Sequence, residues 1–276
     1  MNRWDIGDVK ITRVIESENA FDVTMLLPEA TAENIRKEEW LQPNFADEKG
    51  AAKLSIHALA VESGGRKIVV DTCIGNDKRR PGMETLHTSF LNDLTQAGFA
   101  RESVNLVLCT HLHVDHVGWN TMLVDGRWVP TFPNARYLMT RKEWEHWGPT
   151  KDPAIGDSVQ PLFDAGLVDL VDTDHRINDE IWLEPTIGHT PGHVSVRISS
   201  KGQEAVISGD LMHHPIQLGH PDWKCTFDTD ADQGCKTRRA FMERYADRAV
   251  LVFGTHFATP SVGHIVKHGS AFRFRI

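Results

Sequence analysis

The sequence has few of the features that mark membrane or secreted proteins. None of its apolar runs approaches the roughly 20 residues that span a bilayer. Its opening stretch, MNRWDIGDVKITRVIE, alternates between polar and apolar side chains and lacks the apolar core of a signal peptide. The four cysteines show no C-x-x-C spacing and stand at positions 73, 109, 225 and 235. We therefore predict a cytoplasmic protein with reduced thiols.

Positive charge is also scarce. The chain has 30 Lys and Arg against 38 Asp and Glu, a formal net charge of -8. Proteins that bind nucleic acid without specificity usually carry the opposite sign. We read the short basic runs at 78–80 and 236–239 as solvated surface. We expect a small-molecule partner, no nucleic acid and no membrane, and we leave a homodimer open.

The 276 residues suffice for one large domain with its own core. No linker rich in Pro, Gly or Ser divides the chain, so we predict a single domain over 1–276. A polar excursion at about 17–53, with a helical piece around 31–41, is expected to form a lid or a dimer contact. Its apolar side chains are candidates for that lid: Phe21, Met25, Leu26 and Trp40.

Periodicity predicts strands interspersed with helices. Expected strands are 3–16, 55–63, 66–71, 104–109, 135–140, 167–172, 180–187, 193–199, 203–208 and 249–253. Expected helices are 85–97, 141–147 and 233–246. This mixture favours an α/β or α+β fold in which helices cover the sheets.

Side chains that could bind a metal are most concentrated in CTHLHVDHVGWN, at 109–120, directly after a predicted buried strand. Loops at strand ends carry function because the sheet fixes their base. In an extended chain, His111 and His113 project to one side and can converge on one ion. Where the chain turns, Asp115 and His116 aim elsewhere. The pattern suits two nearby metal ions better than one.

Three further ligand candidates stand at predicted strand ends. They are His193 in GHTPGH, Asp210 in SGD and His256 in GTH. Five histidines and two aspartates make a nitrogen-dominated set that suits zinc, and also iron, cobalt or manganese. We expect His189, four residues before His193, to support the turn.

These motifs resemble those of the metallo-β-lactamase superfamily of metal-dependent hydrolases. The resemblance rests on THLHVDH at 110–116, TPGH at 190–193, SGD at 208–210, GTH at 254–256 and VDT at 70–72. It implies an α+β fold, the αββα sandwich of two mixed sheets face to face with helices outside. It also implies two divalent ions with the following ligands: His111, His113 and His193 for the first, Asp115, His116 and His256 for the second, and Asp210 as the bridge. Asp71 matches an aspartate that supports the site.

Within the superfamily, the chain is most similar to the lactonase and esterase branch, which includes acyl-homoserine-lactone lactonases and methyl parathion hydrolases. We therefore expect a hydroxide shared by two ions to cleave a lactone or ester of a hydrophobic small molecule. Asp115 or Asp210 would carry the proton to the leaving group. The alternatives are a phosphotriesterase or a glyoxalase-II-like thioesterase. A nuclease or a flavodiiron-type oxidoreductase is less favoured.

The chain departs from this branch at two points. Cys73 replaces the glycine of the usual D-T-G, and no tyrosine follows Asp210 closely. We expect His213 and His214 to face the pocket and contact the substrate instead, one of them donating to the substrate oxygen, and we take His214 as a candidate catalytic residue. Trp119 is expected to line the pocket wall.

Overall fold

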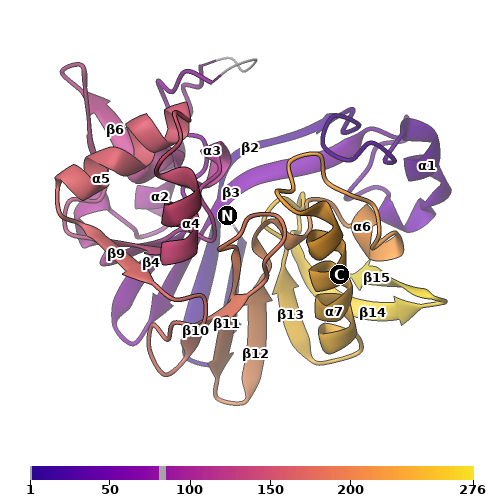
Figure 1. Ribbon diagram of the computed structural model, residues 1–276. Helices are drawn as coiled ribbons and strands as arrows, with labels where there is room; N and C mark the ends of the chain where they lie inside the picture. Colours follow the sequence, from indigo (N-terminus) through magenta and orange to yellow (C-terminus); the bar gives the residue numbers. More distant parts are fainter. Residues whose placement is uncertain (1, 81–84) are drawn as a thin grey trace.

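The computed structural model describes residues 2–80 and 85–276 and contains two large sheets (Figure 1). The first has seven strands, in the order β1 (Asn2–Ile6), β2 (Val9–Phe21), β3 (Ala52–Ser63), β4 (Arg66–Val70), β5 (Leu106–Leu108), β8 (Arg136–Thr140) and β9 (Val168–Val171). The second has six, in the order β10 (Ile181–Pro185), β11 (Val194–Ser200), β12 (Gln203–Ile207), β13 (Val250–Phe253), β14 (Val262–His268) and β15 (Ala271–Arg275). A separate hairpin pairs β6 (Thr121–Val124) with β7 (Arg127–Pro130). Met1 and residues 81–84 of the predicted domain lie outside the described residues.

Both sheets are mixed, and the parallel pairs are joined by helical crossovers. Parallel neighbours are β4–β5, β5–β8, β8–β9 and β12–β13. Such pairs cannot be closed by a tight turn and need a long connection, usually a helix. The α-helices are α1 (Ala32–Lys37), α2 (Phe90–Gln96), α3 (Val114–Val117), α4 (Arg141–Trp147), α5 (Gln160–Asp164), α6 (Ile216–Gly219) and α7 (Ala231–Tyr245). Shorter helical turns span Glu39–Leu41, Arg101–Ser103, Gly118–Asn120, Ile155–Val159 and Gly209–Leu211.

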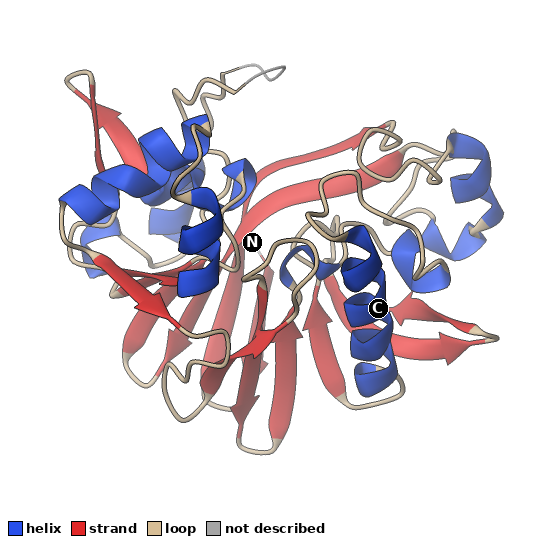
Figure 2. Cartoon of the chain, viewed as in Figure 1, coloured by secondary structure: helices blue, strands red, loops and turns tan. Residues whose placement is uncertain are grey.

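The two sheets pack face to face over one apolar layer. That layer draws buried side chains from both sheets, among them Leu59, Val70 and Leu108 from the first and Val196, Ile207 and Phe253 from the second. Figure 2 shows the helices on the outer sides of the sheets. Phe90 of α2 packs on the first sheet, and Phe241 of α7 packs on the second. This is the αββα sandwich that the motifs predicted, and the prediction is confirmed.

The excursion at 17–53 is packed against the C-terminal end of the chain. Figure 1 shows β2 and β3 continuing toward α1, past the ends of their neighbours β1 and β4. Buried Ile35 and Phe45 belong to one core cluster with Phe257 and Phe274. The lid candidates divide into two pairs according to exposure. Leu26 and Trp40 pack against this cluster, while Phe21 and Met25 are 47% and 81% exposed.

Several elements differ from the sequence prediction. The single strand expected at 3–16 is a hairpin, because Gly7 turns the chain with a φ of 60°. The helix expected from residue 85 begins at Phe90. The strands β6, β7, β14 and β15 had no predicted counterpart.

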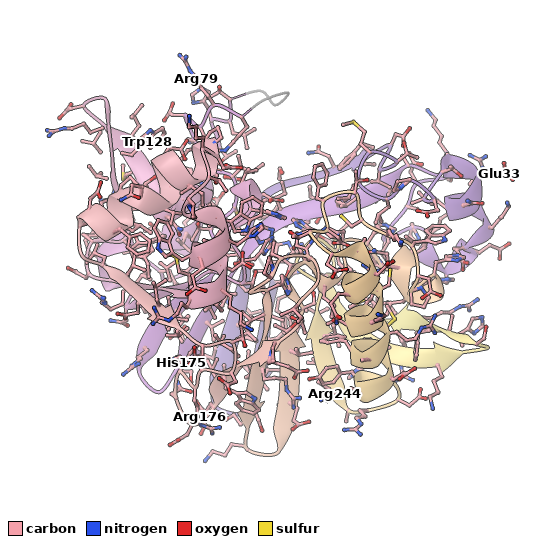
Figure 3. All side chains as sticks on the ribbon, viewed as in Figure 1. Glu33, Arg79, Trp128, His175, Arg176 and Arg244 are labelled. Carbon is pink, nitrogen blue, oxygen red and sulfur yellow. The ribbon has the colours of Figure 1, made fainter. Side chains whose placement is uncertain are left out.

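Among the described residues, no helix is long and apolar enough to cross a bilayer. Glu33 and Arg244 are two of the charged side chains on the surface (Figure 3).

The loop after β4 and the loop after β5 are in close backbone contact. The Gly118 and Trp119 N–H groups donate to the carbonyls of Cys73 and Thr72, both at 2.8 Å. A Cβ on Gly118 would lie 1.7 Å from the Ile74 carbonyl oxygen. Cys73 adopts a φ of 55°, in the left-handed region that favours the glycine it replaces. This contact fixes the histidine-rich loop against the first sheet.

We predict that Gly118→Ala lowers the free energy of unfolding by at least about 3 kcal/mol, because backbone atoms on both sides would have to move apart. Gly156→Ala is the matched control, since a Cβ there meets no atom of the described residues within 4 Å. The control should change the unfolding free energy by less than about 1 kcal/mol. Denaturant unfolding of the metal-depleted variants measures both, and equal effects would contradict this packing.

Candidate metal centre

The candidate ligands gather where strands of both sheets end. Asp71 follows β4, His111 follows β5, Asp210 follows β12 and His256 follows β13. The carboxyl ends of parallel neighbours meet at the same edge of a sheet, and the face-to-face packing brings the two edges together. As a result, His111 Nε2 of the first half lies 3.8 Å from Asp210 Oδ2 of the second half.

The histidine-rich loop changes from extended chain to helix at His113, which has φ -71° and ψ 162°. His111 and His113 therefore precede the turn, and Asp115 and His116 lie on the short helix α3. The predicted divergence produces two groups whose ligand atoms lie within 4.8 Å of one another. The first group is His111, His113 and His189, and the second is Asp115, His116 and His256.

Asp210 joins the two groups. It forms a third such group with His111 and His116. Its Oδ2 lies 3.1 Å from His256 Nε2, 3.2 Å from His116 Nε2 and 3.6 Å from His189 Nε2. A single carboxylate oxygen thus faces both groups, which is the arrangement expected of a bridging ligand.

The structure corrects the assignment of His193. Its Nε2 accepts the Asp210 N–H at 2.8 Å, and its Nδ1 donates to the Thr186 carbonyl at 3.0 Å. Both ring nitrogens are engaged, so His193 positions Asp210 and has no lone pair left for an ion. His189, which we expected only to support the turn, takes its place, with Nε2 2.9 Å from His113 Nδ1. The sequence offers both histidines in GHTPGH, and spacing alone does not say which points inward.

The residues present fit metal ions. Among the described residues, buried His111 Nε2, His116 Nε2 and Asp210 Oδ1 have no hydrogen-bond partner. Leaving such atoms unpaired in a protein interior costs free energy, which an ion would offset. Ligand atoms about 2.0–2.2 Å from a tetrahedral zinc lie about 3.3–3.6 Å apart. His116 Nε2 and His256 Nε2 each lie 3.5 Å from an Asp115 oxygen.

Two buried carboxylates orient histidines of the centre. Asp71 accepts from His116 Nδ1 at 3.0 Å, and Asp228 accepts from His189 Nδ1 at 2.8 Å. Each bond holds the opposite ring nitrogen, Nε2, toward the centre, as carboxylate–histidine–metal arrangements do. Asp71 was a candidate for this role. Asp228 carried no sequence signal, because it lies in an irregular stretch far from the motifs.

Glu143 was also missed by sequence reasoning. Its carboxylate accepts the Gly192 N–H at 2.7 Å, the Leu112 N–H at 3.2 Å and the Trp147 indole N–H at 3.1 Å. It therefore ties the histidine-rich loop to the turn that carries His189. Burial raises the pKa of Glu143 and these hydrogen bonds oppose the rise.

The two groups of ligands differ in their protonation. Burial holds the pKa of His111 and His189 well below the usual value and lowers that of His113 to about 4. Burial also disfavours charge on His116 and His256, but Asp210 and Asp115 outweigh it and raise both pKa values. In the metal-free protein the second group therefore holds protons more tightly than the first group does.

Of the two histidines after Asp210, only His213 faces the centre. Its Nε2 lies 3.3 Å from Asp210 Oδ2. The prediction that His214 faces the pocket and acts there is wrong. Its Nε2 donates to the Phe45 carbonyl at 2.7 Å and its Nδ1 accepts from the Ile216 N–H at 3.1 Å. Adjacent side chains point apart, and His214 joins the excursion to the second sheet.

Trp119 also differs from its predicted role at the pocket wall. Its indole is 5% exposed and stacks on Phe90 with ring centroids 5.9 Å apart. The indole N–H donates to Glu16 at 2.7 Å, and Glu16 also accepts the N–H groups of Ile74 and Gly75. Trp119 thus belongs to the core beneath α2, and through Glu16 it is connected to the loop after β4.

Comparison with known proteins places this geometry in context. Residues 52–266 match the family model described as the metallo-beta-lactamase superfamily. The chain is 25% identical over 191 residues to a "Probable metallo-hydrolase" of Mycobacterium tuberculosis, an alignment covering 58% of each chain. It is 25% identical over 117 residues to an N-acyl homoserine lactonase of a Bacillus species, covering 42% of each. The chain thus spans less than two thirds of the length of these relatives.

Solved structures agree with the fold over nearly the whole chain. AidC, described as a dizinc quorum-quenching lactonase, superposes with a TM-score of 0.80 at 20% identity, covering 99% of this chain and 96% of AidC. The hydrolase AbOPH superposes with a TM-score of 0.81 at 25% identity, covering 99% of this chain and 95% of AbOPH.

We predict that Asp228→Asn weakens metal binding at the His111, His113 and His189 group about 10- to 100-fold, because His189 loses the carboxylate that orients it. Asp222→Asn is the control, since that carboxylate is exposed and, in the described part of the chain, pairs with no residue besides exposed Arg239. Competition with a chromophoric zinc chelator measures the affinity. Equal zinc affinities for the two variants would contradict the orienting role.

We also predict that acid weakens the two ions unequally. An ion entering the Asp115, His116 and His256 group must displace protons held at raised pKa values, so its affinity falls as pH decreases. The His111, His113 and His189 group is already neutral and holds its ion until the pH nears the His113 pKa of about 4. Zinc titration calorimetry at pH 8 and pH 6 should show the second dissociation constant rising at least about tenfold. An equal pH dependence of both ions would contradict the assignment.

Proposed function

The chain belongs to the metallo-beta-lactamase superfamily, and on that premise we propose that it is a dinuclear metal-dependent hydrolase that cleaves a lactone or ester of a hydrophobic small molecule. The observation that carries the proposal is the meeting of two His and Asp ligand groups at the Asp210 carboxylate. Two divalent ions, expected to be zinc, would supply an activated water and polarise the oxygen that gains charge. The likeness to lactonases supports the substrate class.

The two aspartates of the centre suit different tasks. The Asp210 side chain is 4% exposed and faces several histidine nitrogens, so it can hold the two ligand groups together. The Asp115 side chain is 26% exposed and is the more open of the two. Asp115 therefore suits the transfer of a proton to the departing oxygen, since its more open side chain is the one that a substrate can reach.

His213 is placed to take the role that a tyrosine has in many related lactonases. Its ring lies beside the ligand rings of the centre, with its centroid 4.9 Å from that of His189 and 5.8 Å from that of His256. The side chain is 3% exposed, so water competes little for its nitrogens. We propose that it donates a hydrogen bond to the substrate carbonyl oxygen.

Two exposed apolar side chains near the segment that carries Asp228 favour a hydrophobic substrate. The Thr226 N–H donates to the Leu26 carbonyl at 2.9 Å, so the excursion lies against the segment that carries Asp228. Next to this contact, Met25 is 81% exposed and Phe227 is 57% exposed. Exposed apolar side chains near a segment that carries a residue of the centre are candidates for contact with an alkyl or aryl group.

A substrate panel tests the proposed reaction. Zinc-loaded protein should hydrolyse lactones or aryl esters, and faster with longer acyl chains than with acetyl. Asp210→Asn should lower kcat/KM at least about 100-fold, the upper range for losing even an outer partner of a metal ligand. The Asp222→Asn variant should match the wild type.

The panel also contains phosphotriesters and glutathione thioesters, which address the alternative reactions. A preference for either class over lactones and esters would overturn the proposed substrate class. Hydrolysis that survives Asp210→Asn undiminished would overturn the dinuclear site.

A further inference from the structure

A buried cysteine borders the metal centre. Cys225 Sγ lies 3.7 Å from His213 Nε2. With His189, these residues form a fourth group whose ligand atoms all lie within 4.8 Å of one another. All three residues are at most 3% exposed. The proposed hydrolysis makes no use of the thiol.

The spacing of this group matches a tetrahedral metal site. Sulfur about 2.3 Å and nitrogen about 2.1 Å from a tetrahedral ion lie about 3.6 Å apart, close to the separation of the Cys225 and His213 ligand atoms. A fourth ligand is also present. Asp210 Oδ2 lies 3.3 Å from His213 Nε2 and 3.6 Å from His189 Nε2.

The sulfur also accepts a hydrogen bond from the backbone. The Phe227 N–H donates to Cys225 Sγ at 3.4 Å. The other buried cysteines differ, because Cys73 and Cys109 lie in the core beneath the first sheet and in none of the candidate ligand groups of the described residues. Cys225 is thus the cysteine with both a donor to its sulfur and histidine nitrogens beside it.

We propose that His189, His213, Cys225 and Asp210 form an additional position, overlapping the dinuclear centre, for a thiophilic ion such as Cd²⁺, Co²⁺ or excess Zn²⁺. Thiolate ligation selects softer ions than the oxygen and nitrogen ligands of the dinuclear centre do. This position shares His189 and Asp210 with that centre, so an ion here withdraws ligands from it and also occupies His213. It is an inhibitory position, and in this sense it rests on the proposed function.

Cobalt tests the position without an activity assay. Metal-depleted full-length protein is titrated with Co²⁺, and the thiolate-to-cobalt charge-transfer band in the near ultraviolet is followed. The wild type and Cys235→Ser should both show the band. Cys235 is the matched control, because it is the nearest cysteine in sequence and belongs to no candidate ligand group of the described residues. Cys225→Ser should lose the band while keeping the far-ultraviolet circular dichroism of the wild type.

A second variant keeps every thiol in place. His213→Asn should raise the Co²⁺ concentration at half-maximal band intensity at least about tenfold, because one ligand is lost. A wild type without the band, a band that persists in Cys225→Ser, or an unchanged titration in His213→Asn would overturn the proposal. Failure of the proposed function is distinct, since it would appear as zinc-loaded protein that hydrolyses no member of the panel.

Discussion

The structure of this centre depends on one buried carboxylate. Asp210 is 3% exposed, and burying a charge costs several kcal/mol unless it is paired. Here the nearest partners are histidine nitrogens from both halves of the chain, and they hold the pKa of Asp210 well below its usual value despite burial. Its backbone is fixed as well. Gly209 turns with a φ of 59°, and a Cβ there would lie 2.5 Å from the His193 ring that accepts the Asp210 N–H.

The remaining architecture keeps the ligands around that carboxylate. The sandwich brings the ends of β5 and β12 together, although they belong to different sheets. Glu143 ties the first loop to the His189 turn, while Asp71 and Asp228 each fix the ring of one ligand histidine. Ligand geometry is therefore set by hydrogen bonds that are buried with the ligands. Such buried networks are rigid because an unpaired member would be costly.

The αββα sandwich was predicted from the resemblance of the motifs to the metallo-β-lactamase superfamily, and the strand-end positions of the His and Asp residues indicated where the candidate ligands lie. Sequence reasoning failed where the answer depends on side-chain direction. His189 and His193 share one Gly- and Pro-rich turn, and only the fold shows which ring faces inward. The same holds for His213 and His214. Asp228 and Glu143 were missed because their partners are far away in sequence.

The central claim is that two ions meet at Asp210 and that His189, not His193, holds the first. A crystal structure of the zinc-loaded protein with anomalous scattering at the zinc edge tests it most directly. We expect two peaks, one within reach of His111, His113 and His189 and one within reach of Asp115, His116 and His256, with His193 still accepting the Asp210 N–H. A single peak, or a zinc ion bound to His193, would contradict the account.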